Sequence, residues 1–126
     1  MTSQASDVYI VDGSRTPFLK ARGKAGPFSA TDLAVDTART LLLRQPFAPT
    51  ALDTVVTGCV MPSQNEANIS RLIALRLGCG VGMPAYTVQR NCASGLQAVD
   101  SAAKDIRDGR YSLVLAGGTE AMSHAP

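Results

Sequence analysis

The 126-residue chain has 45% hydrophobic and 17% charged residues, a composition typical of a globular domain with one core, which excludes a disordered or fibrous protein. Its 12 basic and 10 acidic residues give a formal net charge of +2. Because the basic residues are scattered rather than gathered into a stripe, nucleic acid is not an expected partner.

The first half of the chain predicts a strand, a long loop, a helix and a second strand, over residues 8–11, 15–29, 31–44 and 52–61. The first strand is a β-branched and aromatic run that stops at Asp12-Gly13, which has the chemistry of a turn. We expect Thr31-Asp32 to cap the helix, which Pro46 follows. The second strand is almost wholly apolar and is therefore expected to be mostly buried.

The second half predicts a helix, a strand, a helix and a strand, over residues 69–77, 85–90, 96–106 and 112–116. Asn68 or Ser70 is expected to cap the first of these helices, and Gly78 to end it. In the second helix apolar residues recur at helical spacing and most positions between them are small, so more than one side can pack. The last strand is a continuous apolar run that ends in Gly117-Gly118, like a buried parallel strand.

This alternation of strands and helices indicates the fold class. It predicts an α/β layered fold with a largely parallel sheet and right-handed crossovers between its strands. The sequence contains no internal repeat and no low-complexity tract. We therefore expect one domain over the whole chain.

The three cysteines, at positions 59, 79 and 92, lack C-x-x-C spacing, and His124 is the single histidine. Disulfides and a zinc site are therefore disfavoured, and no metal is predicted. The first seven residues are polar and lack the apolar run of a secretory signal, and no apolar stretch approaches the length that crosses a membrane. A reducing, cytoplasmic location is the default expectation.

Cys92 stands where a predicted strand passes into the first turn of a predicted helix, in the stretch Gln-Arg-Asn-Cys-Ala-Ser-Gly-Leu-Gln. Unpaired N–H groups and the positive end of the helix dipole favour a thiolate at such a place and can stabilise an oxyanion on an attacked carbonyl. The small residues that follow leave room for a thioester to approach the sulfur. Position alone also allows a second interpretation, in which Cys92 is a small buried hydrophobe.

The other reactive side chains are assigned packing or surface roles. Cys59 lies inside an apolar strand and Cys79 lies between two glycines, so both are expected to be buried and inert. His124 is expected in an exposed loop, and Glu120 is expected to bond nearby backbone rather than to act as an acid or base. Packing is predicted for Met61, Met83 and Met122, and a solvated loop for Lys20, Arg22 and Lys24.

Two ordered motifs resemble the thiolase family: Asn-Cys-Ala-Ser-Gly-Leu-Gln-Ala-Val over residues 91–99 and Ala-Gly-Gly-Thr-Glu-Ala-Met-Ser over residues 116–123. In that family a nucleophilic cysteine precedes a buried helix, and a Gly-Gly-x-Glu-x-Met-Ser turn follows the next strand. Arg15-Thr16-Pro17-Phe18 resembles the family's Arg-Thr-Pro loop, and Asp32-Leu33 resembles its first helix start. The resemblance extends from about Val8 to Pro126, with one departure at Gln89, where the family usually has Asn or another small polar residue.

The resemblance implies a layered thiolase-like fold with a mostly parallel sheet and a buried central helix, of which residues 1–126 are the amino-terminal part. It implies acyl exchange between 3-ketoacyl-CoA and CoA through a Cys92 acyl-enzyme, with the Cys92 N–H as half of an oxyanion hole. Coenzyme A and its thioesters are then substrates, and no metal or redox cofactor is implied. By the same analogy the strand at residues 85–90 pairs with its copy in a homodimer or homotetramer of the full-length protein.

The remaining catalytic parts of the family come from later motifs, including a His in a Gly-His-Pro context that His124 does not match. Cys-dependent acyl transfer of this kind needs a base and a second acid or base, so the chain is expected to be catalytically incomplete. Two alternatives stay open. One is another condensing enzyme, such as a ketoacyl synthase or a hydroxymethylglutaryl-CoA synthase, and the other is a noncatalytic truncated product or interaction module.

Overall fold

Three parallel strands form the centre of the molecule in the computed structural model, which describes residues 7–125. β1 (Thr54–Gly58) lies between β2 (Ala85–Val88) and β3 (Val114–Gly118). The helices are α1 (Ala30–Leu43), α2 (Ile69–Arg76) and α3 (Ser94–Arg107), with short 3-10 turns η1 (Pro49–Ala51) and η2 (Met122–His124). The predicted α/β fold with a parallel sheet is confirmed, and the strands and helices expected after residue 30 are present with shifted ends.

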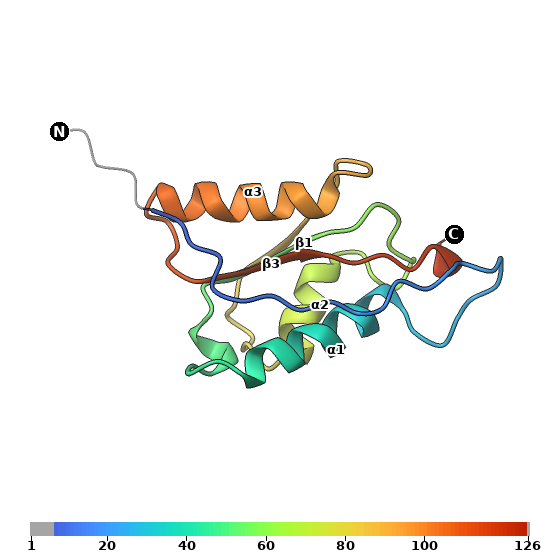
Figure 1. Ribbon diagram of the computed structural model, residues 1–126, viewed down its shortest axis with the longest axis horizontal. Coiled ribbons are helices and arrows are strands. Elements are labelled where there is room, and N and C mark those ends of the chain that lie inside the picture. The colour runs from blue at the N-terminus through green and yellow to red at the C-terminus, as the bar shows by residue number, and fades with distance from the viewer. Residues whose placement is uncertain (1–6, 126) are drawn as a thin grey trace.

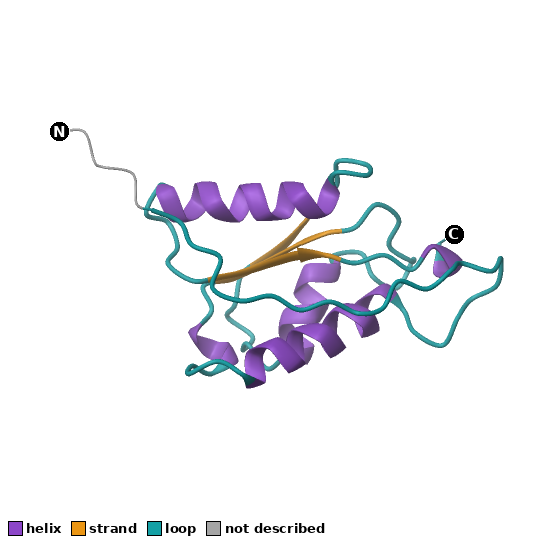
Figure 2. Cartoon of the chain, in the orientation of Figure 1, coloured by secondary structure: helices purple, strands orange, loops and turns teal. Residues whose placement is uncertain are grey.

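The sheet separates two helical layers (Figure 1). Helix α3 covers one face, and α1 and α2 cover the other, as the colouring by secondary structure in Figure 2 makes plain. β1 is buried along its whole length, with Val55 in the larger apolar cluster on the α1 and α2 side. Val56 lies in a smaller cluster with Ala98 and Ala102 of α3. Burial on both faces explains why two consecutive valines stand in this strand instead of an alternating pattern.

Helix α1 begins at Ala30, and its cap is Ser29 rather than the predicted Thr31-Asp32 pair. Ser29 Oγ accepts a hydrogen bond from Asp32 N at 3.0 Å, and Asp32 Oδ2 accepts one from Ser29 N at 2.9 Å. This reciprocal pair is a capping box, which satisfies two backbone donors at once. The prediction included the acidic member of the pair but placed the cap too late in the chain.

Gly78 ends helix α2 as predicted, with a φ of 78° that lies in the left-handed region favoured by glycine. Asn68 occupies the predicted N-cap position of this helix, but its side chain makes no capping hydrogen bond. Asn68 Nδ2 instead donates to Ala85 O at 3.2 Å, and Asn68 Oδ1 accepts from Thr87 Oγ1 at 2.8 Å. Asn68 therefore joins the start of α2 to the edge strand β2.

The predicted strand at residues 8–11 is wrong, since this segment lies outside the sheet. Tyr9, Ile10 and Val11 are 75%, 86% and 75% exposed. The segment runs beside β3 in Figure 1, but the two line a cleft of about 540 Å³ and form no ladder. β-branched and aromatic residues favour a strand only where their backbone pairs with a partner edge, and this segment forms no ladder with β3, although β3 is an edge strand of the sheet.

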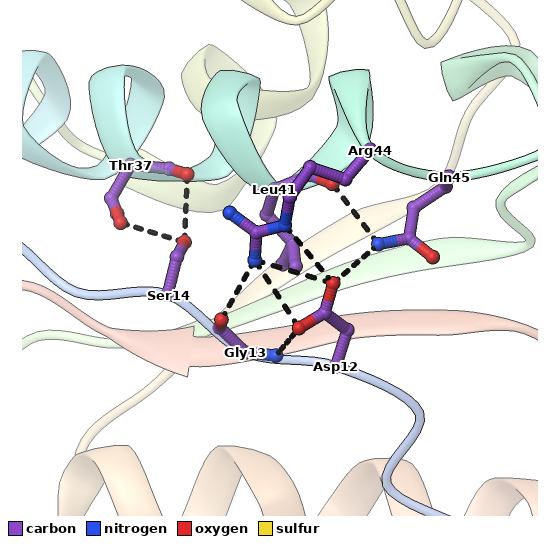
Figure 3. A network of polar contacts seen from close by, with 7 residues as sticks. All are labelled: Asp12, Gly13, Ser14, Thr37, Leu41, Arg44 and Gln45. Carbon is purple, nitrogen blue, oxygen red and sulfur yellow. Dashed lines mark hydrogen bonds and ion pairs between the residues drawn. The ribbon is translucent and has the colours of Figure 1, made fainter.

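Side-chain contacts with α1, rather than strand pairing, anchor the end of this amino-terminal segment (Figure 3). Gln45 Nε2 donates to Asp12 Oδ2 at 2.7 Å, and Arg44 Nη2 lies 3.2 Å from Asp12 Oδ1. Ser14 Oγ lies 2.7 Å from Thr37 Oγ1 and donates to Thr37 O at 2.8 Å. The Arg44 hydrogen bond is the main cause that holds the pKa of Asp12 below its ordinary value. These contacts attach the segment to α1 and leave its strand-like residues unpaired.

Helix α3 buries one side in the described part of the chain. Ala98 and Ala102 are buried against the sheet, whereas Leu96 is 74% exposed and Val99 is 37% exposed. The sequence predicts packing on more than one side, and within residues 7–125 only the sheet side is covered. Leu96 and Val99 therefore stay uncovered in this part of the chain.

Glu66 joins the loop before α2 to the first turn of α1, and its replacement tests this junction. Its Oε1 accepts from Thr31 N and Thr31 Oγ1 at 3.1 and 2.7 Å, and its Oε2 accepts from Ser63 N and Ser63 Oγ at 3.2 and 3.0 Å. Burial alone raises the pKa of Glu66, but these hydrogen bonds outweigh it and lower the pKa below 4.5. Glu66→Gln places an amide donor against the Ser63 donors, so we expect the free energy of unfolding in urea at pH 7 to fall by about 1–3 kcal/mol.

The pH dependence of this loss has a definite sign. A carboxylate whose pKa is lower in the folded state stabilises the fold fully above its unfolded pKa of about 4.5, and the stabilisation is lost as the pH falls through the folded pKa. The difference between Glu66→Gln and the unsubstituted chain should therefore shrink below pH ~4.5. Asp36→Asn, on the exposed side of α1, is the matched control and should stay within about 0.5 kcal/mol of the unsubstituted chain. Equal stability of the two variants at pH 7 would contradict the role of Glu66.

Candidate functional site

Cys92 lies in the turn between the end of β2 at Val88 and the start of α3 at Ser94, as the sequence predicts. Its side chain is exposed, whereas Cys59 and Cys79 are buried with 2% and 4% exposure. The interpretation of Cys92 as a small buried hydrophobe is therefore wrong, and the predicted burial of the other two cysteines is confirmed. Cys92 is the one thiol that a reagent or ligand in solution can reach.

The turn that carries Cys92 has an unusual backbone. Asn91 has a φ of 49°, the only positive φ at a non-glycine residue between residues 7 and 125. A left-handed residue other than glycine costs about 1 kcal/mol or more, and asparagine tolerates it better than most. Gln89 Oε1 accepts a hydrogen bond from Asn91 N, and Ser94 N donates to Asn91 O at 3.1 Å. Gln89, the residue that departs from the family pattern, is thus part of the turn that presents the cysteine.

The carboxyl ends of the three strands meet beneath this turn. In the parallel register Gly58 of β1 lies opposite Val88 of β2 on one side and Gly118 of β3 on the other. In α/β sheets, ligands bind outside the carboxyl ends of the strands, where loops and helix starts converge. Cys92 therefore stands at the edge of the sheet where a binding site is expected.

Two glycines let the start of α3 approach the strand ends closely. A Cβ atom on Gly58 would overlap the carbonyl of Ser94 and lie 2.6 Å from Gly95 N. A Cβ on Gly118 would lie 3.0 Å from Gly95 Cα. The sequence predicts Gly117-Gly118 only as a stop after the strand, and the structure shows that Gly118 also makes room for the helix that follows Cys92.

Glu120 binds backbone and a thiol at the end of β1. Its Oε1 accepts from Val60 N at 2.9 Å, and its Oε2 accepts from Met61 N at 3.4 Å and from Cys59 Sγ at 3.1 Å. The predicted structural role of this carboxylate is confirmed. Burial is the main cause that raises the pKa of Cys59 to about 12, and the hydrogen bond to Glu120 is the second cause.

Thr119 joins the same turn to two further elements, a role that no local pattern predicts. Its N–H donates to Gly58 O at 3.0 Å, and its Oγ1 donates to Ala30 O at 2.7 Å. The turn after β3 is therefore attached to the end of β1 and to the start of α1.

The remaining predicted side chains lie apart from any catalytic arrangement in the described residues. His124 is partly buried in η2, and its Nε2 is 2.7 Å from Gly26 O, so it is less exposed than predicted. Met83 packs in the core as predicted, whereas Met61 and Met122 are 41% and 52% exposed, which corrects the prediction of packing for both. The cations of the long loop are exposed as expected: Lys20, Arg22 and Lys24.

Metal-binding clusters and membrane-spanning helices are both absent between residues 7 and 125. No group of three or more His, Cys, Asp or Glu side chains in this range is arranged to bind a metal ion. Across the same residues no helix combines the length and the apolar character needed to cross a bilayer. The cleft of about 540 Å³ beside β3 does not include Cys92 among its lining residues.

Differential alkylation checks the exposure of the three thiols. Iodoacetamide at pH 8 should modify Cys92 in the folded chain and spare Cys59 and Cys79, because the latter two are buried. With a pKa of about 12, Cys59 also has only about one thiolate per 10⁴ molecules at that pH. Peptide mass spectrometry reads the sites, and the chain unfolded in guanidinium chloride is the control in which all three react. Modification of Cys59 as fast as Cys92 in the folded chain would contradict this description.

Comparison with known proteins gives a consistent result. Residues 8–126 match the sequence model described as Thiolase, N-terminal domain. The mitochondrial 3-ketoacyl-CoA thiolase of Bos taurus and the beta-ketoadipyl-CoA thiolase of Acinetobacter baylyi are each 40% identical to the chain over 120 residues. Those alignments cover 94% of this chain and 30% of each relative, so the chain spans about 30% of the length of these relatives.

Solved structures agree with the sequence comparisons. The acetyl-CoA acetyltransferase of Bacillus anthracis is 38% identical, with a TM-score of 0.75 over 79% of this chain and 25% of that one. A thiolase of Ascaris suum, solved in complex with coenzyme A, is 28% identical, with a TM-score of 0.74 over 78% of this chain and 26% of that one. The match of residues 8–126 to the family's N-terminal domain shows that the chain belongs to the thiolase family.

Proposed function

We propose that this chain is the amino-terminal part of a longer thiolase, in which Cys92 carries the acyl group during exchange between 3-ketoacyl-CoA and CoA. The observation that carries the proposal is the exposed Cys92 at the start of α3, inside the segment that matches the thiolase N-terminal domain. Two relatives that are named as ketoacyl-CoA and ketoadipyl-CoA thiolases, and the coenzyme A complex of the Ascaris thiolase, support the substrate class.

The proposed reaction has two halves. The Cys92 thiolate attacks the ketone carbon of a 3-ketoacyl-CoA and forms a carbon–sulfur bond. The bond from that carbon to the α-carbon then breaks, and the α-carbon leaves with the electron pair and takes up a proton to give acetyl-CoA. The thiol of a free CoA next attacks the Cys92 thioester, which releases the shortened acyl-CoA and returns the cysteine thiol. The reverse sequence condenses two acyl-CoA units.

The described residues supply only part of this machinery. The N–H of Cys92 is proposed to stabilise the negative charge that develops on the attacked carbonyl oxygen. The hydrogen bonds of His124 go to Gly26 and those of Glu120 to the end of β1, rather than to Cys92. The base and the second acid or base are therefore proposed to come from later parts of a longer chain.

Association and location belong to the same proposal. β2 pairs only with β1 among the described strands, so its other edge is open, and Tyr86 on β2 is 38% exposed. An open edge of this kind can pair with its copy in a second subunit, which supports a homodimer or homotetramer of the full-length enzyme. The three free cysteines fit a reducing cytoplasmic location.

One experiment tests the proposed function. The polypeptide isolated from its source is incubated with acetoacetyl-CoA without free CoA, and peptide mass spectrometry reads its length and any adduct. A chain longer than this segment with an acetyl group on Cys92 is the expected result. An acetyl group taken from acetyl-CoA but not from acetoacetyl-CoA would favour another condensing enzyme. A chain that ends at Pro126 and carries no adduct would overturn the proposal in favour of a noncatalytic product.

A further inference from the structure

One buried hydroxyl closes the turn that carries Cys92. Ser94 is 3% exposed, and its Oγ accepts from Arg90 N at 2.7 Å and donates to Asn91 O at 2.7 Å. Ser94 N donates to the same Asn91 oxygen at 3.1 Å. Two donors from one residue therefore hold the carbonyl of the peptide that joins Asn91 to Cys92.

The direction of this carbonyl determines the direction of the Cys92 N–H. The structure contains no cis peptide bond in its described part, and a trans peptide is planar, so the N–H of Cys92 points opposite to the carbonyl of Asn91. Since the carbonyl is bonded to Ser94 at the start of α3, the N–H is directed away from Ser94. Without the hydroxyl, Asn91 loses one of the bonds that keep it at a φ of 49°, away from the conformations that asparagine adopts most often.

Ser94 itself is rigidly placed. Its carbonyl group lies so close to Gly58 that no side chain fits on that glycine, and the next residue, Gly95, also approaches Gly118 closely. The hydroxyl thus projects from backbone that is seated on the ends of β1 and β3. A group that is fixed in this way can set the geometry of a neighbouring turn.

We infer that Ser94 is a positioning residue for the acylation of Cys92. Its hydroxyl orients the Asn91–Cys92 peptide so that the N–H of Cys92 faces the oxyanion that forms when the thiolate attacks a thioester carbonyl. The inference rests on the proposed function, and it adds a residue that acts through the peptide without touching the substrate.

The test compares two reactions of the same sulfur in a full-length thiolase that contains this segment. In the first, the Cys92 thiolate takes the acetyl group from acetyl-CoA, and the CoA thiolate leaves; this exchange passes through an oxyanion and needs no proton transfer at an α-carbon. In the second, iodoacetamide alkylates Cys92 and iodide leaves, with no oxyanion. Ser94→Ala should slow acetylation by about tenfold or more, because a misdirected N–H stabilises the oxyanion poorly, and should leave the alkylation rate within about twofold.

Ser70→Ala is the matched control. Ser70 is also buried in the first turn of a helix, and its Oγ accepts from Thr87 Oγ1 at 3.2 Å, so the variant loses a buried serine hydroxyl that has no bond to residues 89–94. If Ser94→Ala only loosened the fold, it would change the rates of acetylation and alkylation together, or slow acetylation no more than Ser70→Ala does. Either outcome would overturn the inference.

Failure of the proposed function has a different signature. If the unsubstituted full-length enzyme takes no acetyl group from acetyl-CoA while iodoacetamide still alkylates Cys92, the proposed chemistry is at fault. The orientation of the peptide is then read from the amide ¹H–¹⁵N resonance of Cys92, which should shift in Ser94→Ala and not in Ser70→Ala. An unshifted Cys92 resonance in Ser94→Ala would overturn the positioning role by itself.

Discussion

A full-length thiolase that contains this segment with Cys92→Ala is expected to lose thiolysis of acetoacetyl-CoA by about 10⁴-fold or more, because no acyl-enzyme can form without the sulfur. The loss should appear in kcat, since the methyl group of alanine leaves room for the substrate. Initial rates at saturating CoA, followed by the disappearance of acetoacetyl-CoA, measure it.

The buried cysteines provide the controls for this result. Cys79→Ala removes a thiol that is 4% exposed, and the variant should keep thiolysis within a few-fold of the unsubstituted enzyme. Cys59→Ala removes a thiol bonded to Glu120, and its activity should be retained to a similar degree because Glu120 keeps the N–H of Val60 as a donor. Thiolysis retained in Cys92→Ala, or abolished in Cys79→Ala alone, would assign the nucleophile to another group.

The features that the sequence predicts well are those that neighbouring residues determine. The helical period after Cys92 and the apolar run before Gly117 give α3 and β3 with small errors at their ends. The position of Cys92 between β2 and α3 follows from the same local patterns, and its exposure agrees with that position. Local chemistry also accounts for the end of α2 at Gly78, where the backbone needs a left-handed residue.

The errors concern contacts between distant residues. Residues 8–11 have strand-like composition, but a strand must pair with a partner edge, and composition carries no information on whether the segment does so. No local pattern predicts the role of the Ser94 hydroxyl or the need for a glycine at position 58. Both depend on the close approach of Gly58 and Ser94, which are 36 positions apart in the sequence. The cap of α1 is also hard to place, because several polar residues near Ala30 have suitable side chains and only the folded geometry selects Ser29.

Gly58→Ala is expected to destabilise the chain by about 3 kcal/mol or more, at the upper end of overpacking effects. The new Cβ would overlap the Ser94 carbonyl and lie 2.6 Å from Gly95 N. Both neighbours are backbone atoms, so no side-chain rotation relieves the clash. The start of α3 must instead move off β1, and the small core that contains Val56 and Ala98 must open with it.

Gly117→Ala on the adjacent strand is the matched control, because no atom lies within 4 Å of the position that its new Cβ would take. The stability of this variant should stay within about 1 kcal/mol of the unsubstituted chain. Urea unfolding followed by far-ultraviolet circular dichroism measures both variants. If Gly58→Ala still folds, the turn before Ser94 should be displaced, and acetylation of Cys92 in the full-length enzyme should fall in parallel with stability. Unchanged stability in Gly58→Ala would mean that α3 is not seated on β1, and the geometry proposed to present Cys92 to its substrate would lose its support.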